Sequence, residues 1–157
     1  MAYKYFNDKK YLKAAKSTAA YLENEIISKA DYFSSTLDAN CEDKEASLYA
    51  ATAMYYLALI SSGDEQQRYS DLCLKASYFA LSWYYMWDVP FAQGQMIGDI
   101  GLKTRGWGNV SVENNHIDVF IFEFGSVLNW LSKRYDEPRF HDFVNVISTS
   151  MKQLLPF

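Results

Sequence analysis

Two stretches of this chain would be apolar on nearly every side as helices, and they restrict the fold more than any other feature. Residues 46–60 read ASLYAATAMYYLALI and residues 117–131 read IDVFIFEFGSVLNWL. A helix without a polar face has to be buried on most of its sides. Other segments carry apolar residues at helical spacing on one face only, and no segment shows sustained strand alternation. The sequence therefore predicts an all-α fold.

Helical periodicity indicates about five long helices, alternately amphipathic and apolar. They are expected over residues 8–28, 43–60, 64–87, 115–135 and 136–155. Amphipathic helices belong on the outside and apolar ones inside, so we expect antiparallel helical hairpins in two layers, within a single domain of residues 1–157. Residues 88–114 hold five glycines and one proline, together with apolar side chains that are a poor composition for disorder. They predict one long ordered loop, with a short hairpin around residues 103–111.

Composition and charge argue against several classes of function. The net charge is −4 with no long basic run, so a nucleic-acid partner is not expected. We expect a soluble protein without a signal peptide or membrane contact, while its compartment stays open. No phosphate-binding glycine loop or metal-ligand spacing is present, which predicts neither cofactor nor metal. Two cysteines make no disulfide framework, and the sequence does not decide whether Cys41 and Cys73 pair.

Reactive side chains gather in residues 103–118, KTRGWGNVSVENNHID, just before the second apolar helix. They are Arg105, Trp107, Glu113, Asn114, Asn115, His116 and Asp118. Asn115 is predicted to cap the helix, which places His116 and Asp118 in its first turn. Burying a carboxylate or an imidazole without a partner costs several kcal/mol, so such groups are normally paired or used. Two interpretations remain: these residues form a ligand site, or Arg105 pairs with Glu113 or Asp118 as a structural clasp that fixes the loop. Asp118 alone has a further explanation, because the helix dipole stabilises a carboxylate in the first turn of a helix.

A second acidic cluster begins the other apolar helix. Asp43 and Glu45 would lie at the same end of the bundle as residues 103–118 if the two inner helices are parallel. Two carboxylates across a cleft are what glycoside hydrolysis requires, whereas the alternative duty of both residues is to complement the helix dipole. Trp87 and Asp88 end the third helix in SWYYMWDVPF, either as a wall of a sugar subsite or as a helix end packed on the core.

With these segments in place, the chain resembles the six-hairpin glycosidase-like (α/α) toroids, enzymes of carbohydrate breakdown built from concentric rings of helices. The segments that carry the resemblance are Asp43-Lys44-Glu45, Trp87-Asp88-Val89-Pro90-Phe91, Arg105-Gly106-Trp107-Gly108 and Glu113-Asn114-Asn115-His116. It implies catalytic carboxylates in loops at the mouths of the inner helices. A complete toroid has more helices than the five predicted here, so we expect a piece of a longer enzyme, or a reduced relative with an open cleft. Missing hairpins would leave apolar edges that invite a partner, either a second copy of the chain in a homo-oligomer or the missing hairpins of a longer chain.

The leading hypothesis is glycoside hydrolysis of a carbohydrate substrate. Glu113 or Asp118 would supply one carboxylate and Asp43 or Glu45 its partner. Substrate-binding roles fall to Trp107, Trp87, Arg105, Asn115 and Asp88. One alternative is polysaccharide lyase chemistry, in which Asn115 polarises a uronate carboxyl while His116 removes the adjacent proton. The other is a non-catalytic helical scaffold or interaction fragment.

Overall fold

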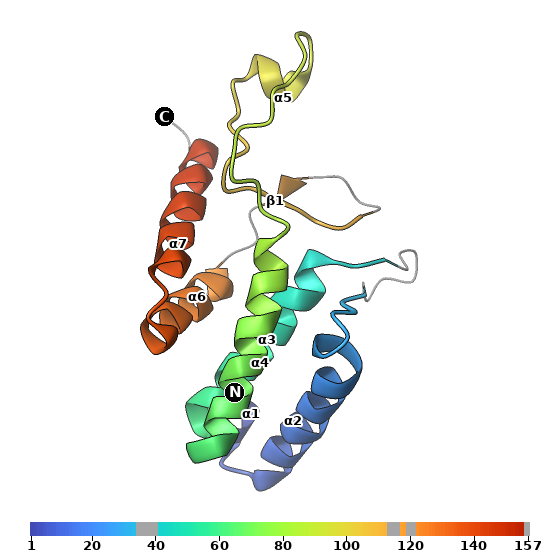
Figure 1. Ribbon diagram of the computed structural model, residues 1–157, viewed down its shortest axis with the longest axis vertical. Helices are drawn as coiled ribbons and strands as arrows, with labels where there is room; N and C mark the ends of the chain where they lie inside the picture. The colour runs from blue at the N-terminus through green and yellow to red at the C-terminus, as the bar shows by residue number, and fades with distance from the viewer. Residues whose placement is uncertain (34–40, 113–116, 119–121, 156–157) are drawn as a thin grey trace. The chain divides into compact units, whose positions relative to one another are not determined.

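The computed structural model describes residues 1–33, 41–112, 117–118 and 122–155. These residues are mostly helical, and the only named strands among them are one short pair (Figure 1). The chain divides into two compact units, an N-terminal unit of Met1–Ala80 and a C-terminal unit of Leu81–Phe157. The all-α class is confirmed, whereas the two-layer arrangement of hairpins and the single domain stay predictions. No helix in the described part of the chain is long and apolar enough to cross a membrane.

In the N-terminal unit, the amphipathic helix that follows a short first helix starts at a side-chain cap. The elements of this unit are α1 (Ala2–Phe6), α2 (Lys9–Tyr21), the π-helix η1 (Leu22–Ile27), α3 (Lys44–Ile60) and α4 (Gly63–Leu81). The Asp8 carboxylate accepts a hydrogen bond of 2.9 Å from the Lys10 amide, which has no partner inside the helix. Because α2 runs directly into η1, the helix predicted over residues 8–28 is confirmed.

The apolar helix predicted over residues 43–60 is confirmed as α3. Asp43 caps it, with Oδ1 accepting a hydrogen bond of 3.2 Å from the Ala46 amide. Along the helix, Ala51, Met54 and Ala58 have no exposed surface. One face of the helix is thus buried along its length, whereas Tyr49 and Leu59 on other sides are exposed, so α3 is less enclosed than its apolar sequence predicts.

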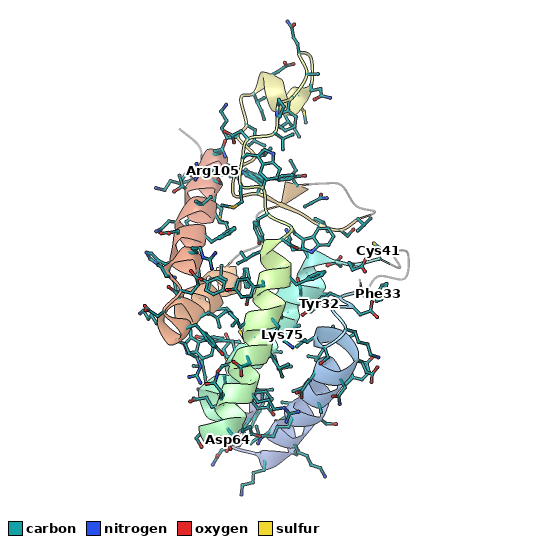
Figure 2. All side chains as sticks on the ribbon, in the orientation of Figure 1. Tyr32, Phe33, Cys41, Asp64, Lys75 and Arg105 are labelled. Carbon is teal, nitrogen blue, oxygen red and sulfur yellow. The ribbon has the colours of Figure 1, made fainter. Side chains whose placement is uncertain are left out.

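Two titratable side chains are buried in the interior of this unit. Tyr32, labelled in Figure 2, packs its ring 4.4 Å from that of Phe79, and burial raises the pKa of its phenol to about 12. On α4 burial likewise raises the pKa of the Cys73 thiol to about 12. Cys73 and Cys41 are both buried free thiols, so they do not form a disulfide with each other.

In the C-terminal unit, two packed helices follow a long irregular segment. The elements are α5 (Met96–Asp99), β1 (Gly108–Asn109), β2 (Ile117–Asp118), α6 (Phe122–Tyr135), α7 (Pro138–Met151) and the 3₁₀-helix η2 (Lys152–Leu154). The packed faces of α6 and α7 bury Phe124, Leu128, Leu131, Phe140 and Ile147. Pro138 occupies the first turn of α7, and α7 with η2 confirms the helix predicted over residues 136–155.

The third helix is shorter than its sequence predicts. It was expected to reach Trp87, but α4 ends at Leu81. The physical reason is that the backbone of the next residues bonds to a later segment: Tyr84 forms a bridge with Gly108, and the Tyr85 amide donates to the Trp107 carbonyl at 2.8 Å. Those groups cannot also bond within a helix.

The fourth helix also begins later than predicted. It was expected from Asn115, whereas α6 begins at Phe122. Ile117 and Asp118 are instead extended and pair antiparallel with Asn109 and Gly108. The prediction that Asp118 lies in the first helical turn is therefore wrong, because its backbone belongs to a strand. The hairpin expected within residues 103–111 is replaced by this pairing of β1 with β2.

Candidate functional site

Two segments of the C-terminal unit, residues 83–89 and 104–109, hold each other through their backbones. The Tyr85 amide donates to the Trp107 carbonyl, and the Gly106 amide donates to the Tyr85 carbonyl, each at 2.8 Å. The long ordered loop predicted from the sequence therefore has a defined conformation where the structure describes it. Its two arms lie side by side, so residues that are far apart in the sequence become neighbours.

A buried threonine joins the two arms next to the predicted site residues. Thr104 has no exposed surface. Its Oγ1 accepts a hydrogen bond of 2.7 Å from the Val89 amide and donates one of 3.1 Å to the Trp87 carbonyl. Beside it, Asp88 Oδ1 accepts a hydrogen bond of 3.1 Å from the Arg105 amide. The structure thus brings together Trp87, Asp88 and Arg105.

The same loop is attached to the C-terminal end of α7, beside which Arg105 lies (Figure 2). The Lys103 amide donates to Gln153 Oε1 at 2.8 Å, and Gln153 Nε2 donates back to the Lys103 carbonyl at 3.0 Å. In addition, the Ser150 hydroxyl donates to the Arg105 carbonyl. The backbone of the loop makes these contacts, so they do not use the cationic side chains of Lys103 and Arg105.

Loop and helix together form a groove of about 510 Å³, which we call the α7 groove; polar residue types line it, although most of the surface that they expose there is apolar. Its lining residues are Asp88, Lys103, Arg105, Asn145, Val146, Thr149, Ser150 and Gln153. It offers one carboxylate and two cations, and neither cation forms an ion pair within the described residues. Trp87, the neighbour of Asp88, is 63% exposed, and its ring centroid lies 6.3 Å from that of Tyr85. Trp87 does not line the groove and is connected to it only as the sequence neighbour of Asp88.

The sequence-based prediction missed the contribution of α7 to this groove. Asn145 and Thr149 on α7, and Gln153 on η2 directly after it, follow one another at intervals of four, the spacing of one helix face. That spacing was the available signal. It was overlooked because polar residues on an amphipathic helix are usually only its solvated face.

Other predicted site residues lie elsewhere. Trp107 is only 6% exposed, so of the two tryptophans proposed for sugar stacking Trp87 alone presents its surface to solvent. Asp43 and Glu45 belong to the N-terminal unit, where Asp43 is 8% exposed and caps α3. Three predicted residues and one side chain lie outside the described residues: Glu113, Asn115, His116 and the side chain of Asp118. The pairing of carboxylates across a cleft therefore stays a prediction.

Neither a metal site nor similarity to known proteins assigns a function to the described residues. Among the described residues, no three His, Cys, Asp or Glu side chains lie close enough together to hold a metal ion. Comparison with protein-family models, curated proteins and solved structures finds no match to this chain. The resemblance to the six-hairpin glycosidases accordingly stays a prediction from the sequence.

Proposed function

We propose that this chain is a carbohydrate-active domain of the glycoside hydrolase type, and that the α7 groove binds the saccharide. The observation that supports this is the set of charged, amide and hydroxyl side chains that line the groove, together with the exposed ring of Trp87, the sequence neighbour of Asp88. A sugar ring has an apolar face suited to an aromatic surface and many hydroxyls that need hydrogen-bond partners. Trp87 offers the first, and Asp88 and Arg105 offer the second.

Catalysis in this proposal uses two carboxyl groups in different protonation states. One protonates the leaving oxygen while the other acts as nucleophile or activates water. We assign Glu113 or Asp118 to one of these roles, as the sequence predicts. Asp88 has a substrate-positioning role, because one of its oxygens already accepts a hydrogen bond from the Arg105 amide. Its second oxygen and the Arg105 guanidinium would bind sugar hydroxyls.

Binding to polysaccharides, measured by retardation in gels that contain one soluble polysaccharide each, tests the role of Trp87. We expect Trp87→Ala to weaken binding about fivefold, the loss of roughly 1 kcal/mol of aromatic contact. Tyr49→Ala is the matched control, since Tyr49 is 58% exposed and belongs to the N-terminal unit. Equal retardation of both variants and the wild type would contradict the assignment of the α7 groove.

Release of reducing ends from a polysaccharide that binds tests the chemistry. We expect Glu113→Gln or Asp118→Asn to abolish it while polysaccharide binding persists. An ultraviolet-absorbing unsaturated product would instead indicate the lyase alternative with Asn115 and His116. Unchanged hydrolysis in both variants would contradict our assignment of the catalytic carboxylates.

One observation supports the scaffold alternative. Asp43 is buried and its carboxylate caps α3, which gives it a structural duty independent of catalysis. If the scaffold alternative is correct, no polysaccharide binds and none is cleaved.

A further inference from the structure

The N-terminal unit contains a cavity between α1, α2 and α3 whose walls are mainly apolar. It measures about 380 Å³, and the residues that line it all belong to Met1–Ala80. Small-molecule sites in proteins usually enclose about 300–1,000 Å³, with apolar walls and a few polar groups that orient the ligand. We call this space the α2 cavity. It shares no lining residue with the α7 groove, which belongs to the C-terminal unit.

Short side chains leave the α2 cavity open. The helix α2 packs against both α1 and α3. Ala15 and Ala19 of α2 and Ala53 of α3 line the cavity, and longer apolar side chains such as Leu12 and Leu57 form other parts of its wall. Alanine side chains do not fill the space between two packed helices as larger apolar side chains would. The residue types on these helices thus account for a space that a ligand can occupy.

The protein covers the apolar face of α2 only in part. Leu12 and Leu22 are half-buried and Ala15 is exposed, whereas an amphipathic helix usually buries its apolar face. On the α3 side of the cavity, Ala53 and Ile60 are also half-buried. An alkyl chain in the cavity would remove this apolar surface from water, which is energetically favourable. The walls therefore suit an apolar chain.

Lys4 of α1 supplies the charge of this cavity. It is the one lining residue with a charged side chain in the part of the chain that the structure describes. Lys4 is exposed, and no described residue forms an ion pair with it. Because a lysine lays its methylene groups along apolar surface and keeps its ammonium group in water, we expect this charge at the mouth of the cavity. An anionic head group is the complement that the described walls do not provide.

We propose that the α2 cavity binds an amphiphile with one linear alkyl chain and one carboxylate. In this complex the alkyl chain lies against Leu12, Ala15 and Ala53, and the carboxylate pairs with Lys4. A saccharide does not suit these walls, since its many hydroxyls would lose their hydrogen bonds to water without replacement. The proposal therefore does not rest on the carbohydrate function of the α7 groove.

Three ligands, each used below its micellar concentration, test the proposal on the full wild-type chain. Decanoate is the probe, octanoate has the same head group on a shorter chain, and decylammonium has the same chain with the opposite charge. We expect decanoate to bind about tenfold more tightly than octanoate, because it buries two more methylene groups. It should also bind about tenfold more tightly than decylammonium, which Lys4 repels. The net charge of −4 of the whole chain acts in the opposite direction, so a preference for the anion has to come from a local charge.

The methyl signals of ¹³C-labelled alanines show where decanoate binds. Its titration should shift the signals of Ala15, Ala19 and Ala53, which line the cavity. Ala76 is the reference, since it is buried on α4 and does not line the cavity, and its signal should stay in place.

Two pairs of variants separate the charge from the space. Lys4→Met keeps an apolar stem without the charge and should weaken decanoate binding about threefold, whereas Lys13→Met removes an exposed cation that does not line the cavity and should change it little. Ala15→Trp fills the cavity from an exposed position and should abolish binding. Ala14→Trp places the same ring at an exposed position outside the lining and should leave binding intact.

The wild-type chain alone decides if Ala15→Trp does not fold. Equal affinities for decanoate and decylammonium would overturn the proposal, and so would methyl shifts confined to alanines outside the lining. Shifts of the lining methyl groups that appear when the protein is concentrated without ligand would show that a second copy covers the cavity, which also overturns it. The absence of saturable decanoate binding up to the micellar concentration would have the same consequence.

Discussion

Gly106 is the position at which a single methyl group should most disturb the C-terminal unit. Its φ is +86°, a conformation that side-chain-bearing residues adopt only with strain. A Cβ there would also lie 2.7 Å from Ser150 Oγ, 3.0 Å from the Val146 carbonyl oxygen and 3.1 Å from Val146 Cγ1. The carbonyl oxygen belongs to the backbone of α7, so the loop would have to move away from the helix.

The size of the effect follows from two separable costs. A left-handed conformation costs a non-glycine residue about 1–2 kcal/mol. Overpacking against a fixed neighbour adds about 1–3 kcal/mol. Gly94 is the matched control, because its φ is +84° but no atom lies within 4 Å of the position of its Cβ. We therefore expect Gly106→Ala to lower the free energy of unfolding by about 3 kcal/mol, and Gly94→Ala by about 1 kcal/mol.

Tryptophan fluorescence during urea unfolding measures this difference in the relevant unit. All tryptophans of the chain lie in the C-terminal unit: Trp83, Trp87, Trp107 and Trp130. Their emission therefore follows the unfolding of that unit, and a shift in midpoint at constant slope gives the change in stability. Equal losses in Gly106→Ala and Gly94→Ala would refute the close seating of the loop on α7, and with it the shape of the α7 groove.

Three further predictions concern a cap, a thiol and an ion pair. Asp43→Ala should speed amide exchange of Ala46 by removing a cap worth about 1 kcal/mol, whereas Asp43→Asn, which keeps an acceptor oxygen, should change it little. In a Cys41→Ser background, Cys73 of the folded protein should react with a disulfide reagent at pH 8 about a thousandfold more slowly than Cys73 of the protein unfolded in urea. The reason is that burial raises the pKa of the Cys73 thiol from 9.0 to about 12, and an equal rate would contradict that burial. The hydrogen bond from Arg139 lowers the pKa of Glu137 from 4.5 to about 2. The stability that the ionised Glu137 carboxylate contributes is therefore complete above pH 4.5 and lost as the pH falls toward 2, and Glu137→Gln should flatten this part of an acid titration followed by tryptophan fluorescence.

The helices that the sequence predicted well are those whose ends carry local signals. Asp43 before an apolar stretch and Pro138 at the start of an amphipathic one mark α3 and α7 within a residue or two. The predicted C-terminal end of the helix over residues 64–87 and the predicted N-terminal end of the helix over residues 115–135 were wrong for the same reason. Each is set by hydrogen bonds to residues 104–109, a partner distant in sequence, and helical periodicity carries no information about such pairing. An apolar run such as residues 117–131 suits a buried strand as well as a buried helix, so composition could not divide it between β2 and α6.

In the candidate site, too, the sequence could not predict which groups pair with partners that are distant in the sequence. The sequence placed Arg105 in a cluster and left two interpretations open, a ligand site or a structural clasp of its guanidinium on Glu113 or Asp118. In the structure a clasp exists, but the backbone of Arg105 makes it, with the amide donating to Asp88 and the carbonyl accepting from Ser150. Residue type predicts side-chain pairing and is silent on backbone pairing, which depends on how two segments meet. These two contacts use the backbone and leave the guanidinium out of the attachment to α7, and Arg105 lines the α7 groove together with Asp88.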